Sequence, residues 1–183
     1  MLKKLVIFIL LIMVVNASEN IENFKSESYC QIKNNKLFIN KQNDSNYYGY
    51  NICYSKENIV KDLRVSIEFK SISGNIDQGG GIAWRIIDNR NYYVARFNPL
   101  ENNFRLYYVK NGRRIELESS TVELKDGYNK MIILHMKNTI YAYINGKLLL
   151  SYKDSTFDTG GYVGVWSKAD ASTLFKNIIV TKL

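Results

Sequence analysis

Apolar and polar residues alternate along much of the chain, and turn-forming residues separate the alternating segments. Residues 62–70 alternate most regularly, a pattern typical of a β-strand with one buried face. About a dozen short segments of this kind follow one another, and none has a sustained helical period. The chain is therefore predicted to be all-β, either a sandwich or a barrel. The residues of 62–70 expected to face the core are Leu63, Val65, Ile67 and Phe69.

Residues 78–108 predict three consecutive antiparallel strands, because Asn, Asp and Pro interrupt the alternation twice. Turns centred at positions 89–90 and 100–101 would pair Arg85 with Val94 and divide the side chains between two faces. One face is the predicted core: Ile82, Trp84, Tyr93, Phe97, Phe104 and Leu106. The opposite face collects Arg85, Tyr92, Arg96, Arg105 and Tyr107.

The arginines and tyrosines of the second face are the main candidate ligand-binding residues. A guanidinium group presents a planar set of donors that suits hydroxyls or carboxylates, and tyrosine adds a flat apolar surface with a polar tip. A solvated sheet face with cation–π pairs is the alternative. Trp166, Lys168 and Asp170 are further candidates, at the end of a later predicted strand and in the loop after it. Trp166 could instead be a core residue.

In residues 130–137 alternation predicts that Ile132, Leu134 and Met136 face the core and that His135 faces outward. His135 is the only histidine, and nothing near it in sequence marks the acid and nucleophile of a catalytic triad. A histidine on the sheet surface is therefore the expectation.

Residues 1–17 have the features of a secretory signal peptide: two lysines, an apolar run and a small residue at the predicted cleavage point, Ala17. A core helix is the alternative. We expect residues 18–183 to form a single domain and the protein to be exported, to the periplasm or the cell exterior. No other stretch approaches the length of a membrane span, so no integral membrane segment is expected after cleavage.

The formal net charge of the chain is +8, but its basic residues are dispersed. Without a recognised module, this charge does not indicate nucleic-acid binding, and it suits acidic glycans or a bacterial surface. Cys30 and Cys53 are the two cysteines, and in an oxidising compartment they predict a disulfide that stabilises by about 3 kcal/mol. With one histidine, the chain has too few nitrogen and sulfur ligands for a zinc site.

Five segments occur in an order that resembles one class of β-sandwich domain. They are DLRVSIEFK (62–70), GGGIAWR (79–85), NYYVARFNPLENNFRLYYVKNGRR (91–114), INGK (144–147) and GGYVGVWSKADASTLFKNIIV (160–180). The class is the concanavalin A-like domain of the 3-keto-disaccharide hydrolase type, similar to glycoside hydrolase family 16. The resemblance implies a jelly-roll antiparallel sandwich, usually secreted, with a concave face concerned with carbohydrate.

The same resemblance places a glutamate and arginine pattern of the family on Glu68 and Arg85. Lys176 and Asn177 stand where many members have two aspartates, which weakens the case for a structural calcium, so no cofactor is expected. The E-x-D-x-E run of family 16 enzymes is absent from the sequence, and Glu116 and Glu118 are expected to be solvated, charge-paired residues.

These observations predict an exported carbohydrate-binding protein. The first alternative is a hydrolase of glycosides or 3-keto-disaccharides, in which Glu68 acts as acid or base and Arg85 holds the sugar. The second alternative is a structural or adhesive surface protein. Whether the chain is an enzyme is left open by the sequence.

Overall fold

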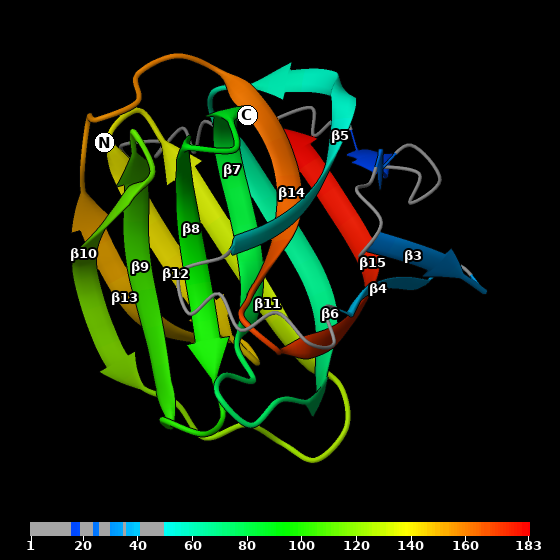
Figure 1. Ribbon diagram of the computed structural model, residues 1–183. Helices are drawn as coiled ribbons and strands as arrows, with labels where there is room; N and C mark the ends of the chain where they lie inside the picture. The colour runs from blue at the N-terminus through cyan, green and yellow to red at the C-terminus, as the bar shows by residue number, and fades with distance from the viewer. Residues whose placement is uncertain (1–15, 19–23, 26–29, 35, 41–49) are drawn as a thin grey trace, which may run out of the picture.

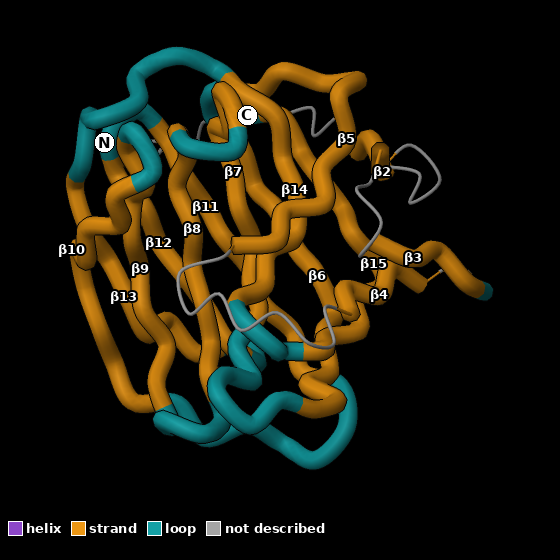
Figure 2. The backbone as a smooth tube through the Cα atoms, in the orientation of Figure 1, coloured by secondary structure: helices purple, strands orange, loops and turns teal. Residues whose placement is uncertain are grey.

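The computed structural model describes residues 16–18, 24–25, 30–34, 36–40 and 50–183. Their strands build two antiparallel sheets that lie face to face (Figure 1). Loops connect the strands at both ends of the sandwich (Figure 2). Within the described ranges no helix is long and apolar enough to cross a membrane. Most of the predicted signal peptide lies outside these ranges.

The first sheet has eight strands and forms one wall of the sandwich. In order, they are β13 (Lys147–Lys153), β12 (Thr139–Ile144), β11 (Asn129–Met136), β6 (Leu63–Ser73), β15 (Ser172–Lys182), β4 (Lys36–Asn40) and β3 (Cys30–Lys33). The eighth strand, β1 (Asn16–Ser18), pairs with β15 beyond the end of β4. Cleavage after Ala17 would therefore leave one residue of β1 in the mature chain.

The second sheet has seven strands. In order, they are β10 (Arg113–Thr121), β9 (Asn103–Lys110), β8 (Asn91–Asn98), β7 (Gly80–Asp88), β14 (Gly161–Lys168), β5 (Tyr50–Val60) and β2 (Phe24–Lys25). The β9–β10 hairpin turns at Asn111 and Gly112, which both have positive φ, as a two-residue Asn-Gly turn requires.

One large apolar cluster fills the space between the sheets. Phe69 of β6 stacks on Phe97 of β8 with ring centroids 3.9 Å apart, so aromatic contacts bridge the two layers. Full burial of each such side chain stabilises the fold by about 1.5–3 kcal/mol. Every core residue predicted for β6 and for β7 to β9 belongs to this cluster, which confirms the prediction for these strands.

A disulfide joins the two sheets. Cys30 of β3 and Cys53 of β5 are bonded, with their Cα atoms 6.1 Å apart, and both are buried at the side of the core. The predicted pairing is confirmed. It ties the short N-terminal strands of one sheet to the other sheet.

The predicted faces of β11 are reversed in the structure. Ile133 pairs with Val65 of β6 and His135 pairs with Leu63, so Met131, Ile133 and His135 face the core. The residues that face outward are Ile132, Leu134 and Met136. Both faces of this strand carry apolar residues, so alternation does not select the inner one. The register with β6 does.

His135 is fully buried, and the prediction that it lies on the outer face is wrong. The indole Nε1 of Trp84 donates a hydrogen bond to His135 Nδ1 at 2.9 Å, and the ring of Tyr93 meets the imidazole edge-on at 5.3 Å. Burial and the nearby positive charge of Arg85 lower the pKa of His135 to about 3. The buried imidazole is therefore neutral at pH 7.

The β7–β8 hairpin contains a bulge that moves Arg85 off its predicted face. Asp88 pairs with Asn91 at the turn, but Ala83 pairs with Val94 further along, so the predicted pairing of Arg85 with Val94 is wrong. Arg85 has a φ of 46°, which is unusual for a residue other than glycine and redirects the side chain. Its guanidinium group reaches the end of the sandwich, where it donates to the backbone oxygens of Lys61, Phe157 and Lys137.

Candidate functional site

The face of the seven-stranded sheet that is turned away from the core carries the candidate site, and we call it the arginine face. Arg96 of β8 pairs with Arg105 of β9, Val94 pairs with Tyr107, and Tyr92 pairs with Val109. Arg114 of β10 pairs with Val109 and extends the face to the sheet edge. Its main members are Tyr92, Arg96, Arg105, Tyr107 and Arg114. Four of them were predicted from the sequence to share a face.

One part of the arginine face is apolar. Its buried residues form a second cluster: Ile52, Ala83, Ile86, Tyr92, Val94, Tyr107, Val109 and Trp166. Trp166 is fully buried, its Nε1 donates to the hydroxyl of Tyr92 at 3.3 Å, and the ring of Tyr50 lies 5.3 Å from it. Tyr50 is half-buried, so in this structure it, and not Trp166, offers an aromatic surface.

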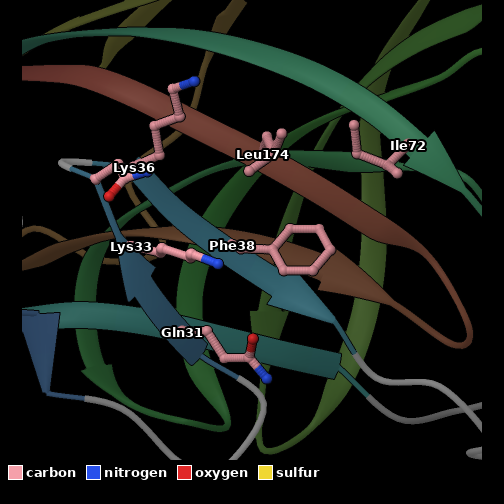
Figure 3. Close-up of a pocket in the computed structure, with 7 residues that line it drawn as sticks. Gln31, Lys33, Lys36, Phe38, Ile72 and Leu174 are labelled. Atoms are coloured by element: carbon pink, nitrogen blue, oxygen red, sulfur yellow. The ribbon is translucent and has the colours of Figure 1, made fainter.

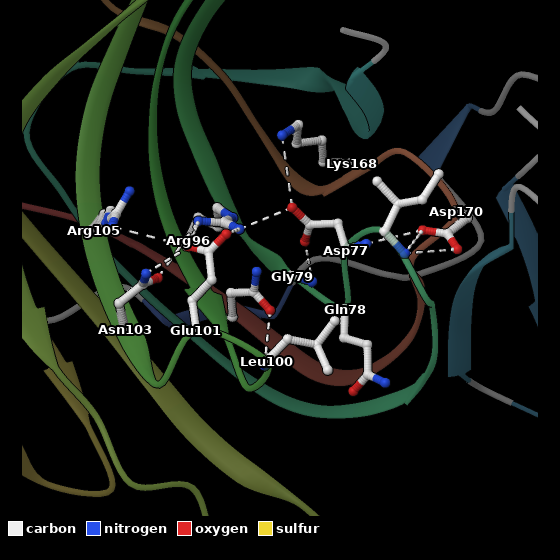
Figure 4. A network of polar contacts seen from close by, with 12 residues as sticks. Asp77, Gln78, Gly79, Arg96, Leu100, Glu101, Asn103, Arg105, Lys168 and Asp170 are labelled. Carbon is white, nitrogen blue, oxygen red and sulfur yellow. Dashed lines mark hydrogen bonds and ion pairs between the residues drawn. The ribbon is translucent and has the colours of Figure 1, made fainter. Parts of the chain in front are cut away.

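The other part of the arginine face is a buried polar network with Arg96 at its centre (Figure 4). Arg96 Nη2 lies 2.9 Å from Asp77 Oδ2 and 3.4 Å from Glu101 Oε1. Arg96 and Asp77 are each 2% exposed, so this ion pair is shielded from water. Burial lowers the pKa of Arg96, but Asp77 and Glu101 raise it above its ordinary value, so the guanidinium group stays charged.

Glu101, from the turn between β8 and β9, links Arg96 to Arg105. Asn103 Nδ2 donates to Glu101 Oε2 at 2.6 Å. Burial raises the pKa of Glu101, but the hydrogen bonds from Asn103 and Arg96 lower it to about 2. Arg105 lies 4.0 Å from Glu101 and 3.5 Å from Glu116 of β10, and 35% of its side chain is exposed. Arg105 is therefore the solvent-facing guanidinium of this network.

Asp170 holds the loop before β7 against the network. Its carboxylate accepts hydrogen bonds from three consecutive backbone N–H groups, those of Asn75 (2.7 Å), Ile76 (3.1 Å) and Asp77 (3.0 Å). Partial burial raises the pKa of Asp170, but these three donors together hold it below its ordinary value. Asp170 is a positioning residue, since it fixes the backbone that presents Asp77 to Arg96.

Gly79 allows this loop to pass close to the network. Its N–H donates to Asp77 Oδ1 at 2.5 Å. A Cβ atom at this position would lie 2.6 Å from Asp77 Oδ1 and 2.8 Å from both Arg96 Nε and the backbone oxygen of Phe97, closer than real contacts allow. Glycine is therefore required by the close approach of backbone and guanidinium.

Lys168 brings a further cation to the network from the end of β14. Its Nζ lies 3.8 Å from Asp77 Oδ2, and 13% of its side chain is exposed. Burial lowers the pKa of Lys168, and the positive charges of Arg114 and Arg96 lower it further, against the opposing effect of Asp77. Lys168 and the arginines thus repel one another in a partly dry site.

Arg114 lies over aromatic rings. Its guanidinium carbon is 4.5 Å from the ring centroid of Tyr107 and 5.4 Å from that of Tyr50. Because Tyr50 also contacts Trp166, this tyrosine of β5 lies between Arg114 at one sheet edge and the apolar cluster. The arginine face therefore joins guanidinium groups directly to aromatic surface.

A separate pocket of about 290 Å³ lies on the outer face of the eight-stranded sheet (Figure 3). It is lined by Gln31, Lys33, Asn34, Lys36, Phe38, Ile72 and Leu174. None of the predicted site residues contributes to it. The described part of the chain also contains no cluster of three or more metal-ligating His, Cys, Asp or Glu side chains.

No protein-family model matches the chain, and no curated protein matches it in sequence. Among solved structures, the carbohydrate-binding module CBM66 from Bacillus subtilis superposes with a TM-score of 0.72 at 16% identity, over 81% of this chain and 88% of that one. The exoplasmic/lumenal domain of VIP36, solved with Ca²⁺ and Man3GlcNAc bound, gives 0.67 at 10% identity, over 88% and 84% of the two chains.

A candidate glycosyl hydrolase from Parabacteroides distasonis gives a TM-score of 0.64 at 16% identity, over 90% of this chain and 96% of that one. Together with the two sheets, these similarities decide the fold. The chain is a concanavalin A-like jelly roll. The fold class predicted from the sequence is confirmed. At these identities the likeness concerns the fold alone, and function has to be argued from the site.

The jelly roll separates Glu68 and Arg85 from the arginine face. Arg85 lies at the end of the sandwich among loops. Glu68 of β6 is on the outer face of the eight-stranded sheet, where Lys176 Nζ lies 3.1 Å away and Asn177 donates to it at 2.7 Å. These hydrogen bonds lower the pKa of Glu68. The two residues singled out by the family resemblance therefore meet neither each other nor Arg96.

Sequence reasoning missed three members of the site, Asp77, Glu101 and Arg114. Asp77 and Glu101 lie in predicted turns or loops, where no alternation assigns a face. Their nearness to a run of glycines and to the Asn102 turn, which has a positive φ of 49°, is the local signal that could have marked them. Arg114 follows the Asn111–Gly112 hairpin, and counting its register from that turn places it on the arginine face.

Proposed function

We propose that this jelly roll binds carbohydrate on the arginine face, at the junction between the Arg96 network and the tyrosines. The observation that carries the proposal is the preformed network, in which the buried pair of Arg96 and Asp77 is linked through Glu101 to the partly exposed Arg105. Fixed planar donors next to aromatic surface suit a sugar, whose hydroxyls accept hydrogen bonds and whose C–H face packs on a ring.

The structures with similar folds support this proposal. CBM66 is a carbohydrate-binding module, and the VIP36 domain was solved with an oligosaccharide. The Emp47p domain, which is a carbohydrate recognition domain, has the same fold with a TM-score of 0.63. Domains of the 3-keto-disaccharide hydrolase type, which the sequence resembles, belong to the same jelly-roll class. That this chain is of that particular type is a proposal.

Hydrolysis at the arginine face is a weaker proposal than binding. A glycosidase requires one carboxyl group that holds a proton near neutral pH. The pKa of Glu101 is lowered to about 2. The carboxylates of Asp77 and Glu101 both form ion pairs with Arg96. Glu68, the acid or base of the hydrolase hypothesis, lies on the other sheet, so this geometry gives that hypothesis no support.

We also infer export. The Cys30–Cys53 disulfide requires an oxidising compartment, which agrees with the signal peptide predicted at residues 1–17. If the full chain is expressed in a bacterial host and fractionated, the mature protein is expected outside the cytoplasm with Ser18 at its N-terminus. Recovery of the intact chain from the cytoplasm, with both thiols free, would contradict export.

The binding proposal is tested by screening the purified protein on a glycan array and measuring the best ligand by calorimetry. Arg105→Ala is the most informative variant, because Arg105 is 35% exposed and its loss leaves the buried pair intact. Its affinity is expected to fall by about tenfold or more, the effect of losing charge-assisted hydrogen bonds.

Arg64→Ala is the matched control, since Arg64 lies on the outer side of β6 in the other sheet. It removes the same charge and is expected to keep wild-type affinity. Equal weakening by the two variants, or unchanged binding in Arg105→Ala, would remove the arginine face as the site. Absence of any glycan ligand, with adhesion to a protein surface instead, would favour the adhesive alternative.

A further inference from the structure

The carboxylates around the arginine face already have cationic partners. Asp77 contacts Arg96 at 2.9 Å, and Glu101 contacts Arg96 at 3.4 Å. Glu116 lies 3.5 Å from Arg105. These three acids therefore balance the charges of three cations, Arg96, Arg105 and Lys168, the last of which lies 3.8 Å from Asp77.

Arg114 has no such partner in the part of the chain that the structure describes. No described carboxylate lies within ion-pair distance of it, and the described residues that it contacts through ring faces are Tyr107 and Tyr50. Its Nη1 atom is inaccessible to water and makes no hydrogen bond, although the side chain as a whole is only half-buried. With respect to the described residues, Arg114 thus presents a guanidinium group that has no carboxylate partner and one unused donor, Nη1.

Other donors of the same face are also unused. Arg96 Nε and Arg105 Nε are buried without a hydrogen-bond partner. The buried hydroxyl of Tyr107 has no partner of good geometry, but it lies close enough to Arg105 to raise the pKa of that guanidinium group. A buried polar group left in this way costs about 1–3 kcal/mol, and native structures contain few. Their gathering on one sheet face indicates a site that lacks an acceptor.

Lys168 adds a cation close to Arg114. Burial is the main cause of its lowered pKa, and the positive charges of Arg114 and Arg96 lower the pKa further, against the raising effects of Asp77 and Glu101. An anion bound between Lys168 and Arg114 would relieve this repulsion and raise the pKa of Lys168.

A carboxylate matches the guanidinium group of Arg114 better than a neutral hydroxyl, because its two oxygens accept both donors of the planar fork. Tyr50, in contact with Arg114, supplies an apolar ring on which the sugar bearing that carboxylate can pack. We propose that the ligand of the arginine face is an acidic glycan containing uronic acid, and that Arg114 contacts its carboxylate. This inference rests on the proposed carbohydrate-binding function.

The test compares each acidic oligosaccharide with its own methyl ester, which keeps the ring and linkage and removes the charge. Oligogalacturonates, oligomannuronates and hyaluronan oligosaccharides are titrated into the purified protein by calorimetry. At least one acid is expected to bind about tenfold more tightly than its ester. The expected ratio in Arg114→Gln is about threefold or less.

Arg113→Gln is the matched control. Arg113 is exposed at the start of the same strand and pairs with Lys110, so the variant removes one positive charge beside the site but not on its face. It is expected to keep the wild-type ratio of acid to ester affinity. If Arg114→Gln does not fold, the wild-type protein provides the test. Its affinity for the acid should fall between 50 and 500 mM NaCl, whereas its affinity for the methyl ester should stay the same.

The outcomes separate this inference from the proposed function. Neutral glycans and methyl esters that bind as tightly as the acids, with binding still lost in Arg105→Ala, would overturn the acidic ligand and leave carbohydrate binding in place. An acid preference that Arg114→Gln leaves unchanged would overturn the role of Arg114. Binding of no glycan at all would overturn both proposals.

Discussion

Arg85 and Arg96 are buried arginines on adjacent strands of one sheet, but their partners differ in kind. The guanidinium group of Arg85 donates mainly to the backbone oxygens of Lys61, Phe157 and Lys137 at 2.6 to 3.0 Å. It also has one longer contact with a carboxylate, that of Asp62 at 3.4 Å. The guanidinium group of Arg96 contacts side-chain carboxylates and keeps its Nε without a partner.

This difference in partners separates a structural arginine, Arg85, from a candidate ligand-binding arginine, Arg96. Backbone oxygens cannot leave without disrupting the loops that carry them, so Arg85 fastens three loops to the end of the sandwich. Carboxylate side chains can move, and Arg96 lies beside Arg105, which reaches solvent. A buried arginine therefore indicates a ligand site only when its partners can be exchanged.

The largest expected effect on stability comes from removing the guanidinium group of Arg85. Arg85→Met should lower the free energy of unfolding by about 4 kcal/mol, because three backbone oxygens and Asp62 lose their donor. Urea denaturation measures this loss. The folded protein should retain wild-type glycan affinity. A loss below about 1 kcal/mol would show that Arg85 does not fasten these loops.

Arg96→Met should affect both stability and binding. It leaves Asp77 buried, with the N–H of Gly79 and, among described cations, Lys168 at 3.8 Å as its partners, and is expected to cost about 3 kcal/mol. In the protein that remains folded, glycan affinity should fall as well, because Arg96 is itself a donor of the arginine face and pairs with Arg105 on the neighbouring strand. Calorimetry on the folded variant checks this, and wild-type affinity would place Arg96 with Arg85 as purely structural.

Acidification should act on the core and spare the arginine face. The folded-state pKa of His135, about 3, lies below its ordinary value of 6.5, so the unfolded chain takes up a proton first and stability falls as pH drops below 6.5. Between pH 7 and pH 5 the loss should be about 2 kcal/mol. His135 is the only histidine, so urea denaturation of His135→Gln should show little change over this interval.

The smallest expected effect on stability comes from Glu101→Gln. Glu101 is 46% exposed, so solvent screening limits the loss to less than about 1 kcal/mol despite its ion pairs. The substitution removes a carboxylate that competes for Arg105, so affinity for an acidic glycan should rise severalfold. Weaker binding in this variant would show that Glu101 positions the ligand and does not compete with it.

The sequence predicts most of the fold because local alternation is strong where one sheet face is polar. In β6, for example, Arg64, Glu68 and Lys70 leave only one face that can be buried. In β11 both faces are apolar, and only the register with β6, a long-range property, decides that His135 points inward. Alternation therefore does not predict the buried face of a strand when that face is decided by the register with a neighbouring strand.

The candidate site is predicted in part for the same reason. Arg96, Arg105 and Tyr107 are placed correctly, because the β8–β9 register follows from a short turn. Arg85 is misplaced, because a bulge shifts the register between Trp84 and Asp88 and no glycine marks it. Asp77 joins Arg96 across 19 positions of sequence, through a loop whose path depends on Asp170.

The most direct test is an NMR titration that follows the Nε–Hε signals of the arginine side chains as a bound glycan is added. Assignment by Arg→Lys variants separates the buried arginines from one another. We expect the signals of Arg96, Arg105 and Arg114 to shift with a common dissociation constant and the signal of Arg85 to stay in place. A saturable titration that moves Arg85, or that leaves the three arginine-face signals unchanged, would contradict this expectation.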